Sequence, residues 1–270
     1  MPDRSELDAA LARYEEALHL RAAVSKSSRD LVGLDSWYRE QLRSKLVNES
    51  AGAGSNDGDS AGGKPRELGK DDLVRLMEWK LARGTWRPRL QEMVASNSPA
   101  SIHTAMEAAL SAAPTDRETA LKEVCKLKAV GPATASAVLA TWFPAEEPFM
   151  SDEGLDYAGA LAAGDKGKKT KRDYTVKAWR EYRHEMQARQ KEEGWTGMAE
   201  LEQAIWAWAT LRKYAQSAEE PEAGAADSDG KSEPSEPEAT VAPASATGRS
   251  GKRRGGADVA ASSEKKRKMR

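Results

Sequence analysis

Residues 121–155 read LKEVCKLKAVGPATASAVLATWFPAEEPFMSDEGL, and this stretch decides the fold of the protein. Leu121, Val124 and Leu127 recur at the spacing of one apolar helical face. Pro132 lies at the first position of a second helix, where its missing N–H group leaves no hydrogen bond unmade. The four residues between these helices leave room only for a tight turn. The sequence therefore predicts two helices joined by a hairpin.

The rest of the sequence up to about residue 216 carries similar helical signals. Thr115 with Glu118 matches a capping box, in which two side chains cap the first turn reciprocally. Ser98 precedes Pro99 at another expected helix start. Helices are expected at about residues 6–24, 35–47, 71–82, 87–96, 99–111, 116–127, 132–142, 152–163, 173–193 and 197–212. No stretch alternates apolar and polar residues over the length of a strand, so the expected fold class is all-α.

Composition divides the chain into four parts. Residues 1–47 should form N-terminal helices that pack on the core of a helical domain at residues 70–216. Residues 48–69 are rich in Gly and Ser and too polar to bury, which predicts a flexible insertion. Residues 217–270 predict a disordered tail, which begins with eight acidic residues against one lysine and ends with nine basic residues against two acidic ones in its last 23.

Bulk composition excludes several classes of protein. The single cysteine, Cys125, excludes an internal disulfide, a zinc cluster of several cysteines and a four-cysteine iron–sulfur cluster. The histidines His19, His103 and His184 show no metal-ligand spacing, so no metal site is expected. No apolar run approaches the roughly 18 residues of a membrane span, and the first residues lack a signal-peptide pattern. We therefore expect an intracellular protein with no membrane partner.

The hairpin turn suggests a site for phosphate. Backbone N–H groups at a helix N-terminus favour an anion, and missing side chains let phosphate oxygens approach. The predicted contacts to a DNA backbone are Lys128, Val130, Gly131, Ala133 and Thr134. Such contacts position DNA without reading its sequence. The alternative is that the Gly-Pro pair merely connects two helices.

The longer segment resembles the helix-hairpin-helix DNA glycosylase superfamily. In that superfamily an L-x-G-[IV]-G-x-x-[TV]-A hairpin is followed some twenty residues later by an essential Asp. The segments WKLARGTWRPRL, ASNSPASI, VGPATASAVLA and PFMSDE resemble an Amun-type group of eukaryotic nuclear glycosylase-like proteins, over about residues 30–212. The resemblance implies a glycosylase-like helical fold, DNA as the partner and no cofactor other than a monovalent cation at the hairpin.

The resemblance places the essential carboxylate at Asp152, with Glu153 as the fallback. In the superfamily this carboxylate faces the sugar of a flipped nucleotide, stabilises oxocarbenium-like charge and orients a water. A structural alternative exists for both residues, because acidic side chains in the first turn of a helix are favoured by the helix dipole.

Three departures from the family pattern bear on activity. Ala129 replaces the first hairpin glycine, at a cost of about 1 kcal/mol if the position has positive φ. Ala133 stands where bifunctional members carry a Schiff-base lysine, which predicts monofunctional hydrolysis. Glu153-Gly154 follows the Asp in place of Thr-His or Val-His, which alters the expected pocket wall.

Aromatic and basic residues near these segments are further candidates. Trp79, Trp86, Trp142 and Tyr157 are in place to stack on a flipped base, although a Trp at helical spacing more often belongs to the core. Two basic clusters could hold phosphates. The first cluster is Lys80, Arg83, Arg87 and Arg89, and the second is Lys166, Lys168, Lys169, Lys171 and Arg172. Residues 1–218 carry 32 basic against 33 acidic residues, so a DNA-binding face would have to be segregated.

The tail carries two basic clusters typical of a bipartite nuclear localisation signal. They are Lys252, Arg253 and Arg254, followed by Lys265, Lys266, Arg267 and Lys268. Non-specific nucleic-acid binding would use the same charges. We expect a nuclear protein, with chromatin or repair proteins as partners of the tail.

Two functions remain open from the sequence. The leading hypothesis is a base-excision repair protein with monofunctional, glycosylase-like hydrolysis of an N-glycosidic bond. The alternative is a non-catalytic nuclear module that binds DNA or protein through the same fold.

Overall fold

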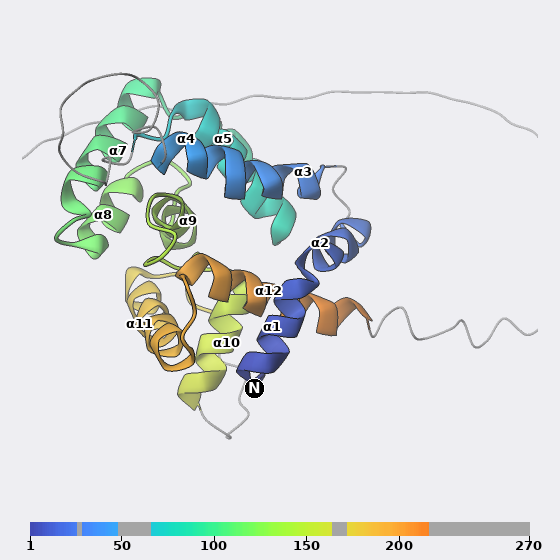
Figure 1. The fold of residues 1–270 in the computed structure, drawn as a ribbon. Helices are drawn as coiled ribbons and strands as arrows, with labels where there is room; N and C mark the ends of the chain where they lie inside the picture. The colour runs from blue at the N-terminus through green and yellow to red at the C-terminus, as the bar shows by residue number, and fades with distance from the viewer. Residues whose placement is uncertain (26–28, 48–65, 164–171, 216–270) are drawn as a thin grey trace, which may run out of the picture. The chain divides into compact units, whose positions relative to one another are not determined.

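A computed structural model of the chain describes residues 1–25, 29–47, 66–163 and 172–215 (Figure 1). Within these ranges every regular element is a helix and no strand is present, so the predicted all-α class is confirmed. The expected insertion at 48–65, most of the lysine loop at 166–171, and the tail with its nuclear localisation clusters lie outside the described residues.

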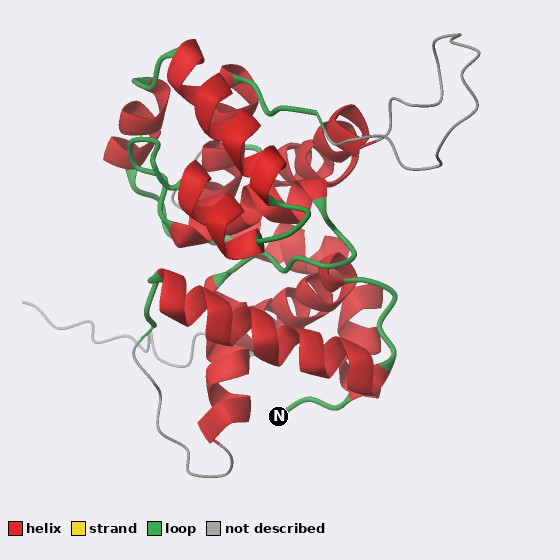
Figure 2. Ribbon diagram, turned by 90° about the vertical axis from the view of Figure 1, so that its left-hand side faces the viewer, coloured by secondary structure: helices red, strands yellow, loops and turns green. Residues whose placement is uncertain are grey.

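In chain order the helices are α1 (Arg4–Ala12), α2 (Tyr14–Ala23), α3 (Leu31–Ser36), the π-helical η1 (Trp37–Leu42), α4 (Arg43–Val47), α5 (Lys70–Arg83), α6 (Pro88–Ala95), α7 (Pro99–Ala112), α8 (Arg117–Val124), α9 (Pro132–Trp142), α10 (Asp152–Ala163), α11 (Val176–Glu193) and α12 (Met198–Ala215). Figure 2 shows only helices and loops among the described residues.

The N-terminal helices differ from the prediction. The expected helix at 6–24 is broken at Arg13, whose φ of −106° and ψ of 22° end α1 and begin α2. The expected helix at 35–47 starts earlier, at Leu31, because the Asp30 carboxylate accepts the backbone N–H of Gly33 as an N-cap. The helix therefore starts four residues before the predicted position, because its cap lies outside the apolar pattern on which the prediction was based.

Two later helices also begin at residues other than those predicted. Asp116, not Thr115, caps α8, since its Oδ1 accepts the N–H groups of Glu118 and Thr119 at 2.9 and 3.1 Å. Helix α11 begins at Val176, behind the side-chain cap of Thr175, and not at residue 173. Ser98 does cap α7 with a following Pro, as predicted.

Helix α9 forms the centre of the fold. All its residues after Pro132 are buried, and it packs against α4, α5, α8 and α11 (Figure 1). A helix that is apolar on all sides is stable only when neighbours cover it fully, and its alanines allow those neighbours to approach. The start of α9 is thereby fixed in position relative to α5 and α8.

Residues 66–69, just before α5, already contact the folded domain. Arg66 donates its backbone N–H to the Leu46 carbonyl at 2.8 Å, and its own carbonyl accepts Nε1 of Trp142 at 2.9 Å. Leu68 is buried. The last residues of the predicted flexible insertion therefore belong to the folded domain.

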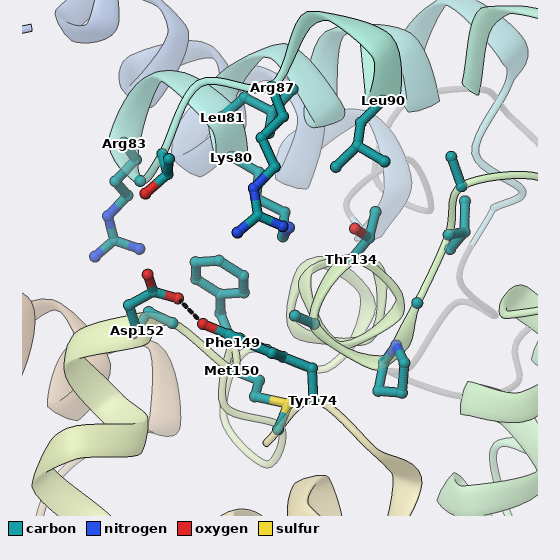
Figure 3. Close-up of a pocket in the computed structure, with 18 of the residues that line it drawn as sticks. Lys80, Leu81, Arg83, Arg87, Leu90, Thr134, Phe149, Met150, Asp152 and Tyr174 are labelled. Atoms are coloured by element: carbon teal, nitrogen blue, oxygen red, sulfur yellow. Dashed lines mark hydrogen bonds between the residues drawn. The ribbon is translucent and has the colours of Figure 1, made fainter. Parts of the chain in front are cut away.

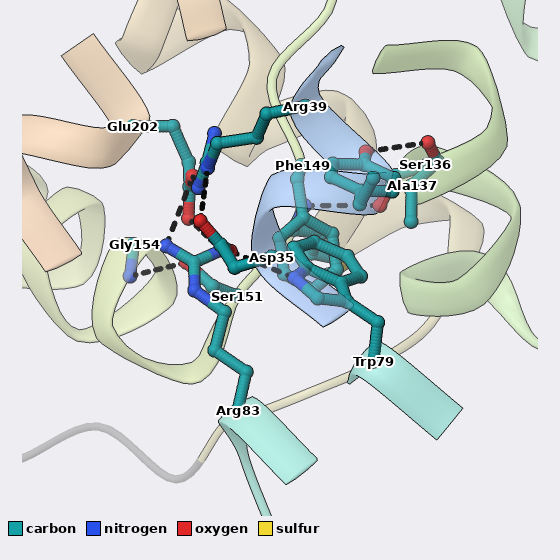
Figure 4. A network of polar contacts seen from close by, with 12 residues as sticks. Asp35, Arg39, Trp79, Arg83, Ser136, Ala137, Phe149, Ser151, Gly154 and Glu202 are labelled. Carbon is teal, nitrogen blue, oxygen red and sulfur yellow. Dashed lines mark hydrogen bonds and ion pairs between the residues drawn. The ribbon is translucent and has the colours of Figure 1, made fainter. Parts of the chain in front are cut away.

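A buried polar network joins α3, η1, α5 and α12 (Figure 4). Asp35 accepts Nε1 of Trp79 at 2.8 Å and Nε of Arg39 at 2.9 Å. Arg83 pairs with Glu202 at 2.9 Å, and both side chains are only 2% exposed. Burial alone would raise the pKa of Asp35, but the neighbouring guanidinium groups lower it overall. The network fixes the end of α5, where the candidate site begins.

Candidate functional site

The hairpin between α8 and α9 leaves two backbone amides without an acceptor. Gly131 is the N-cap of α9, with φ of −98° and ψ of 179°. The N–H groups of Thr134 and Ala135 both donate to the Gly131 carbonyl at 2.9 Å. The N–H groups of Gly131 and Ala133 donate to no group among the described residues. These two amides are therefore free to bind an anion at the helix N-terminus.

The other predicted backbone contacts are placed differently. The amide of Val130 donates to the Leu127 carbonyl at 3.2 Å, and its side chain is buried. Thr134 is also buried, and its amide is used inside the turn. Lys128 is exposed at the turn. Among the five predicted residues, only Gly131, Ala133 and the Lys128 side chain keep groups available at the turn for a phosphate of the DNA backbone.

Asn97 holds the hairpin turn. Its Oδ1 accepts the backbone N–H of Lys128 at 2.9 Å, and its Nδ2 donates to the Lys128 carbonyl at 3.1 Å and to the Val94 carbonyl at 2.9 Å. The next residue, Ala129, has a φ of 61°, the only positive φ of a non-glycine among the described residues. This position therefore does require the left-handed conformation, which costs roughly 1 kcal/mol or more for a residue with a Cβ.

A cavity of about 520 Å³ opens beside the hairpin (Figure 3). One wall is the end of α5 and the loop that follows it, which contribute Lys80, Arg83 and Arg87. The hairpin forms a second wall. The start of α10 and the segment before it form the third, with Phe149 and Asp152. The structure thus brings the hairpin, a cationic helix end and the predicted carboxylate to one cavity.

Asp152 is the first residue of α10, and two side chains hold its carboxylate. Oδ1 accepts the hydroxyl of Tyr174 at 2.7 Å, and Oδ2 accepts Nη1 of Arg172 at 3.0 Å. The Asp152 side chain remains 29% exposed. Arg172 also pairs with Asp156 at 2.7 Å, one turn further along α10. Burial and the hydrogen bond to Asp152 raise the pKa of Tyr174 to about 12, so its hydroxyl acts as a donor.

Two further ionisable groups in the cavity are shifted toward their neutral forms. Burial raises the pKa of Glu153, although the Arg83 guanidinium opposes this shift. Burial likewise lowers the pKa of Lys80, against the attraction of Asp152. The Lys80 side chain makes no hydrogen bond or ion pair with any residue that the structure describes. The cavity therefore contains groups whose charges are incompletely compensated.

The four predicted base-stacking residues do not line this cavity. Trp79 is buried and stacks on Tyr38 with ring centroids 3.7 Å apart. Trp142 and Tyr157 are also core residues. The Arg29 guanidinium lies over the ring of Trp86, with its Cζ atom 3.5 Å from the ring centroid. The aromatic side chains that do line the cavity are those of Phe149 and Tyr174, which the sequence did not single out.

The remaining predictions concern Cys125 and metals. Cys125 lines the cavity, but burial raises the pKa of its thiol to about 11, which disfavours the nucleophilic thiolate. Across the described ranges, no group of three or more His, Cys, Asp and Glu side chains is arranged to hold a metal ion. No helix in those ranges is long and apolar enough to cross a membrane.

Comparison of the chain with protein families, with curated proteins and with solved structures finds no match.

Proposed function

We propose that the protein is a nuclear base-excision repair enzyme that hydrolyses the N-glycosidic bond of a nucleotide flipped out of DNA. The observation that carries this proposal is the shared cavity, onto which both the Asp152 carboxylate and the hairpin open. Its volume of about 520 Å³ lies within the range of roughly 300 to 1,000 Å³ typical of small-molecule sites. A nucleobase with its sugar would fill such a space.

The surrounding residues support this role for Asp152. The hydrogen bonds that the Asp152 carboxylate accepts from Arg172 and Tyr174 fix its orientation in the cavity. An ionised carboxylate beside the sugar stabilises the positive charge that develops as the base departs, and it can orient the attacking water. Glu153, with its raised pKa, is suited to donate a proton to a departing base.

Binding of DNA would use the hairpin and the end of α5. The free amides of Gly131 and Ala133 would hold one phosphate. Arg87, which is exposed at the cavity mouth (Figure 3), would hold another. Phe149 and Tyr174 offer aromatic faces for the flipped base.

Base release from duplexes that each carry one lesion tests the proposal, with the full-length chain beside Asp152→Asn. The variant should lose on the order of 10² to 10⁴ in rate while DNA affinity changes little. Asp156→Asn is the matched control, because Asp156 shares the Arg172 partner but does not line the cavity. An Asp152→Asn variant as fast as wild type would remove Asp152 from the mechanism.

One observation favours the non-catalytic alternative. Both carboxylate oxygens of Asp152 are already engaged, so this group could serve simply to join α10 to the segment at Arg172 and Tyr174. Binding of DNA without release of any base would support that role. Gly131→Asp then tests the hairpin contact, because a Cβ at Gly131 meets no atom within 4 Å. A fall in DNA affinity of about tenfold or more is expected from the added negative charge.

A further inference from the structure

Thr134 carries a buried hydroxyl group without a hydrogen-bond partner. The residue is only 3% exposed, yet it lines the cavity, and Figure 3 shows it on the side of α9 that is turned toward Arg87. Its hydroxyl makes no hydrogen bond with any described residue. The other two hydroxyls of α9, on Ser136 and Thr141, donate to backbone carbonyls at 3.0 and 2.9 Å. A buried hydroxyl without a partner is unfavourable, so it is expected where a ligand supplies the partner.

Two cations share the cavity with this hydroxyl. Lys80 extends from α5 and Arg87 from the loop that follows it, and Figure 3 shows both side chains reaching into the cavity from that side. Neither side chain forms an ion pair or a hydrogen bond with a described residue. Arg83, by contrast, pairs with Glu202 at 2.9 Å. Two uncompensated positive charges and a hydroxyl donor suit a phosphate dianion, which accepts charge-assisted hydrogen bonds.

The opposite wall of the cavity suits the rest of a nucleotide. Figure 3 shows Asp152, Phe149 and Tyr174 across the cavity from the two cations. The rings of Phe149 and Tyr174 offer faces on which a base can stack. The carboxyl groups of Asp152 and Glu153 would repel a phosphate on this side, but they can accept hydrogen bonds from a sugar hydroxyl or a base N–H. A ligand with a phosphate at one end and a base at the other fits both walls.

We propose that the cavity binds a free 5′-mononucleotide, whose terminal phosphate is held inside the cavity by Lys80, Arg87 and the Thr134 hydroxyl. This inference rests on the proposed function only for the position of the base. A nucleotide flipped from a DNA strand stays joined through its phosphates to the neighbouring sugars, so those phosphates remain at the cavity mouth. Only a terminal phosphate can be enclosed deeply enough to reach a side chain as buried as that of Thr134.

The charge of the chain agrees with a small anionic ligand. Residues 1–218 carry 32 basic against 33 acidic residues, so the folded part has no excess of positive charge. Duplex DNA is bound through many phosphates spread along a surface, whereas a single phosphate dianion needs only a local cluster of donors. The volume of about 520 Å³ also lies within the range of small-molecule sites.

Isothermal titration calorimetry of the full-length chain tests the inference. The ligands are the four 2′-deoxynucleoside 5′-monophosphates, the four nucleosides that lack the phosphate, and inorganic phosphate. At least one monophosphate should bind on the order of tenfold or more tighter than its nucleoside, because only the monophosphate reaches the cationic cluster. Inorganic phosphate should bind more weakly than that monophosphate, since it makes no contact with the aromatic wall.

Two variants test the residues that hold the phosphate. Thr134→Val removes the hydroxyl but nearly keeps the shape of the side chain, and it should weaken binding of the monophosphate about tenfold. Thr141→Val is its matched control, because Thr141 is buried on the same helix and does not line the cavity. Lys80→Gln removes one positive charge and should weaken binding about tenfold or more. Its control is Lys126→Gln, because Lys126 pairs with Glu123 outside the cavity.

Three outcomes would overturn the inference. The first is equal affinity for each monophosphate and its nucleoside. The second is wild-type affinity for the monophosphate in both Thr134→Val and Lys80→Gln. The third is a short single strand with a 5′-terminal phosphate that binds at least about tenfold tighter than every mononucleotide, because the phosphate would then belong to a strand end and not to a free nucleotide.

The results also distinguish this inference from the proposed function, since binding of a mononucleotide requires neither catalysis nor a duplex. Preferential binding of a monophosphate without base release from any duplex would count against the hydrolase alone. Base release without preferential binding of a monophosphate would count against the phosphate site alone.

Discussion

Helix α5 contributes residues to both the buried network and the cavity, yet the two regions differ in how far their charged side chains are paired. In the network, Arg83 is paired with Glu202, and Asp35 accepts hydrogen bonds from three side chains. In the cavity, Lys80 lacks an ion pair within the described residues, and the pKa of Glu153 is raised by burial. The backbone differs as well, since the cavity includes the positive φ of Ala129.

The difference separates a region that stabilises the fold from the candidate site. A buried ion pair fixes one arrangement of the helices, and the loss of one member would leave the charge of the other uncompensated. Uncompensated charges and local strain reduce stability, so they are expected to be kept chiefly where a ligand completes them. The folded domain therefore has a buried polar centre in which Arg83 and Glu202 form an ion pair, beside a cavity in which the Lys80 side chain has no ion pair among the described residues.

The largest effect is expected from breaking the network at Glu202. Glu202→Gln would leave Arg83 buried without a counter-charge, which should lower the free energy of unfolding by about 3 to 5 kcal/mol. Urea denaturation measures the loss. Glu181→Gln is the control, because Glu181 forms only an exposed pair with Lys177 and should change stability by less than about 1 kcal/mol. A similarly small effect at Glu202 would show that the network does not hold the helices together.

Replacing Glu153 in the cavity is expected to raise the free energy of unfolding at pH 7, the opposite of the effect expected at Glu202. Its folded-state pKa lies above the ordinary value of 4.5, so the native chain binds more protons than the unfolded chain between those two values. The contribution of Glu153 to stability is thus greatest below pH 4.5 and is lost as pH rises through the folded-state pKa. Glu153→Gln should be more stable than wild type at pH 7 and should lose this advantage in acid.

Denaturation of both proteins at a series of pH values would measure this difference. A Glu153→Gln variant that is less stable than wild type at pH 7 would mean that the carboxylate is satisfied in the native state. Glu153 would then resemble the paired charges of the buried network and would not support the contrast between the two regions.

The smallest change in stability is expected at Ala129 in the hairpin turn. Ala129→Gly would remove the penalty of a Cβ at a φ of 61°, with a net gain in stability of roughly 0.5 to 1 kcal/mol after the larger backbone entropy of glycine is counted. Thermal denaturation would detect a rise in Tm. Gly131→Ala is the companion variant, because its backbone is compatible with any residue and its Cβ would meet open space. A loss of stability in Ala129→Gly would show that the turn is not strained.

The sequence predicted the helical class and the hairpin because those features depend on nearby residues. The start of α9 at Pro132 follows from side chains within a few positions, whereas the turn before it is also held by Asn97, 31 residues away in the chain. Errors occurred where a cap lay just outside the apolar pattern, as at Asp30 and Asp116. The helix break at Arg13 and the π-helical geometry of η1 had no local signal of this kind.

The candidate site was predicted only in part. Its carboxylate and its hairpin lie in one continuous segment, so their spacing in the sequence was sufficient to propose Asp152 and Gly131. The aromatic residues of the cavity were missed, because Phe149 and Tyr174 lie outside the helices, where helical spacing gives no signal. Helical spacing also does not say which face of α5 another helix covers. Trp79 therefore proved to be core, while Phe149 and Tyr174 line the cavity.

Local patterns in the sequence were sufficient to predict most of the helices, the start of α9 and the clustering of basic residues at the end of α5, since each depends on interactions within about one or two helical turns. Only the tertiary structure decided which of those cations would be neutralised. Arg83 meets Glu202 across 119 residues of chain, whereas Lys80, one turn earlier on the same helix, faces a cavity. The physical reason is that the partners of a buried charge are chosen by how helices pack, and no local pattern along the chain records that choice.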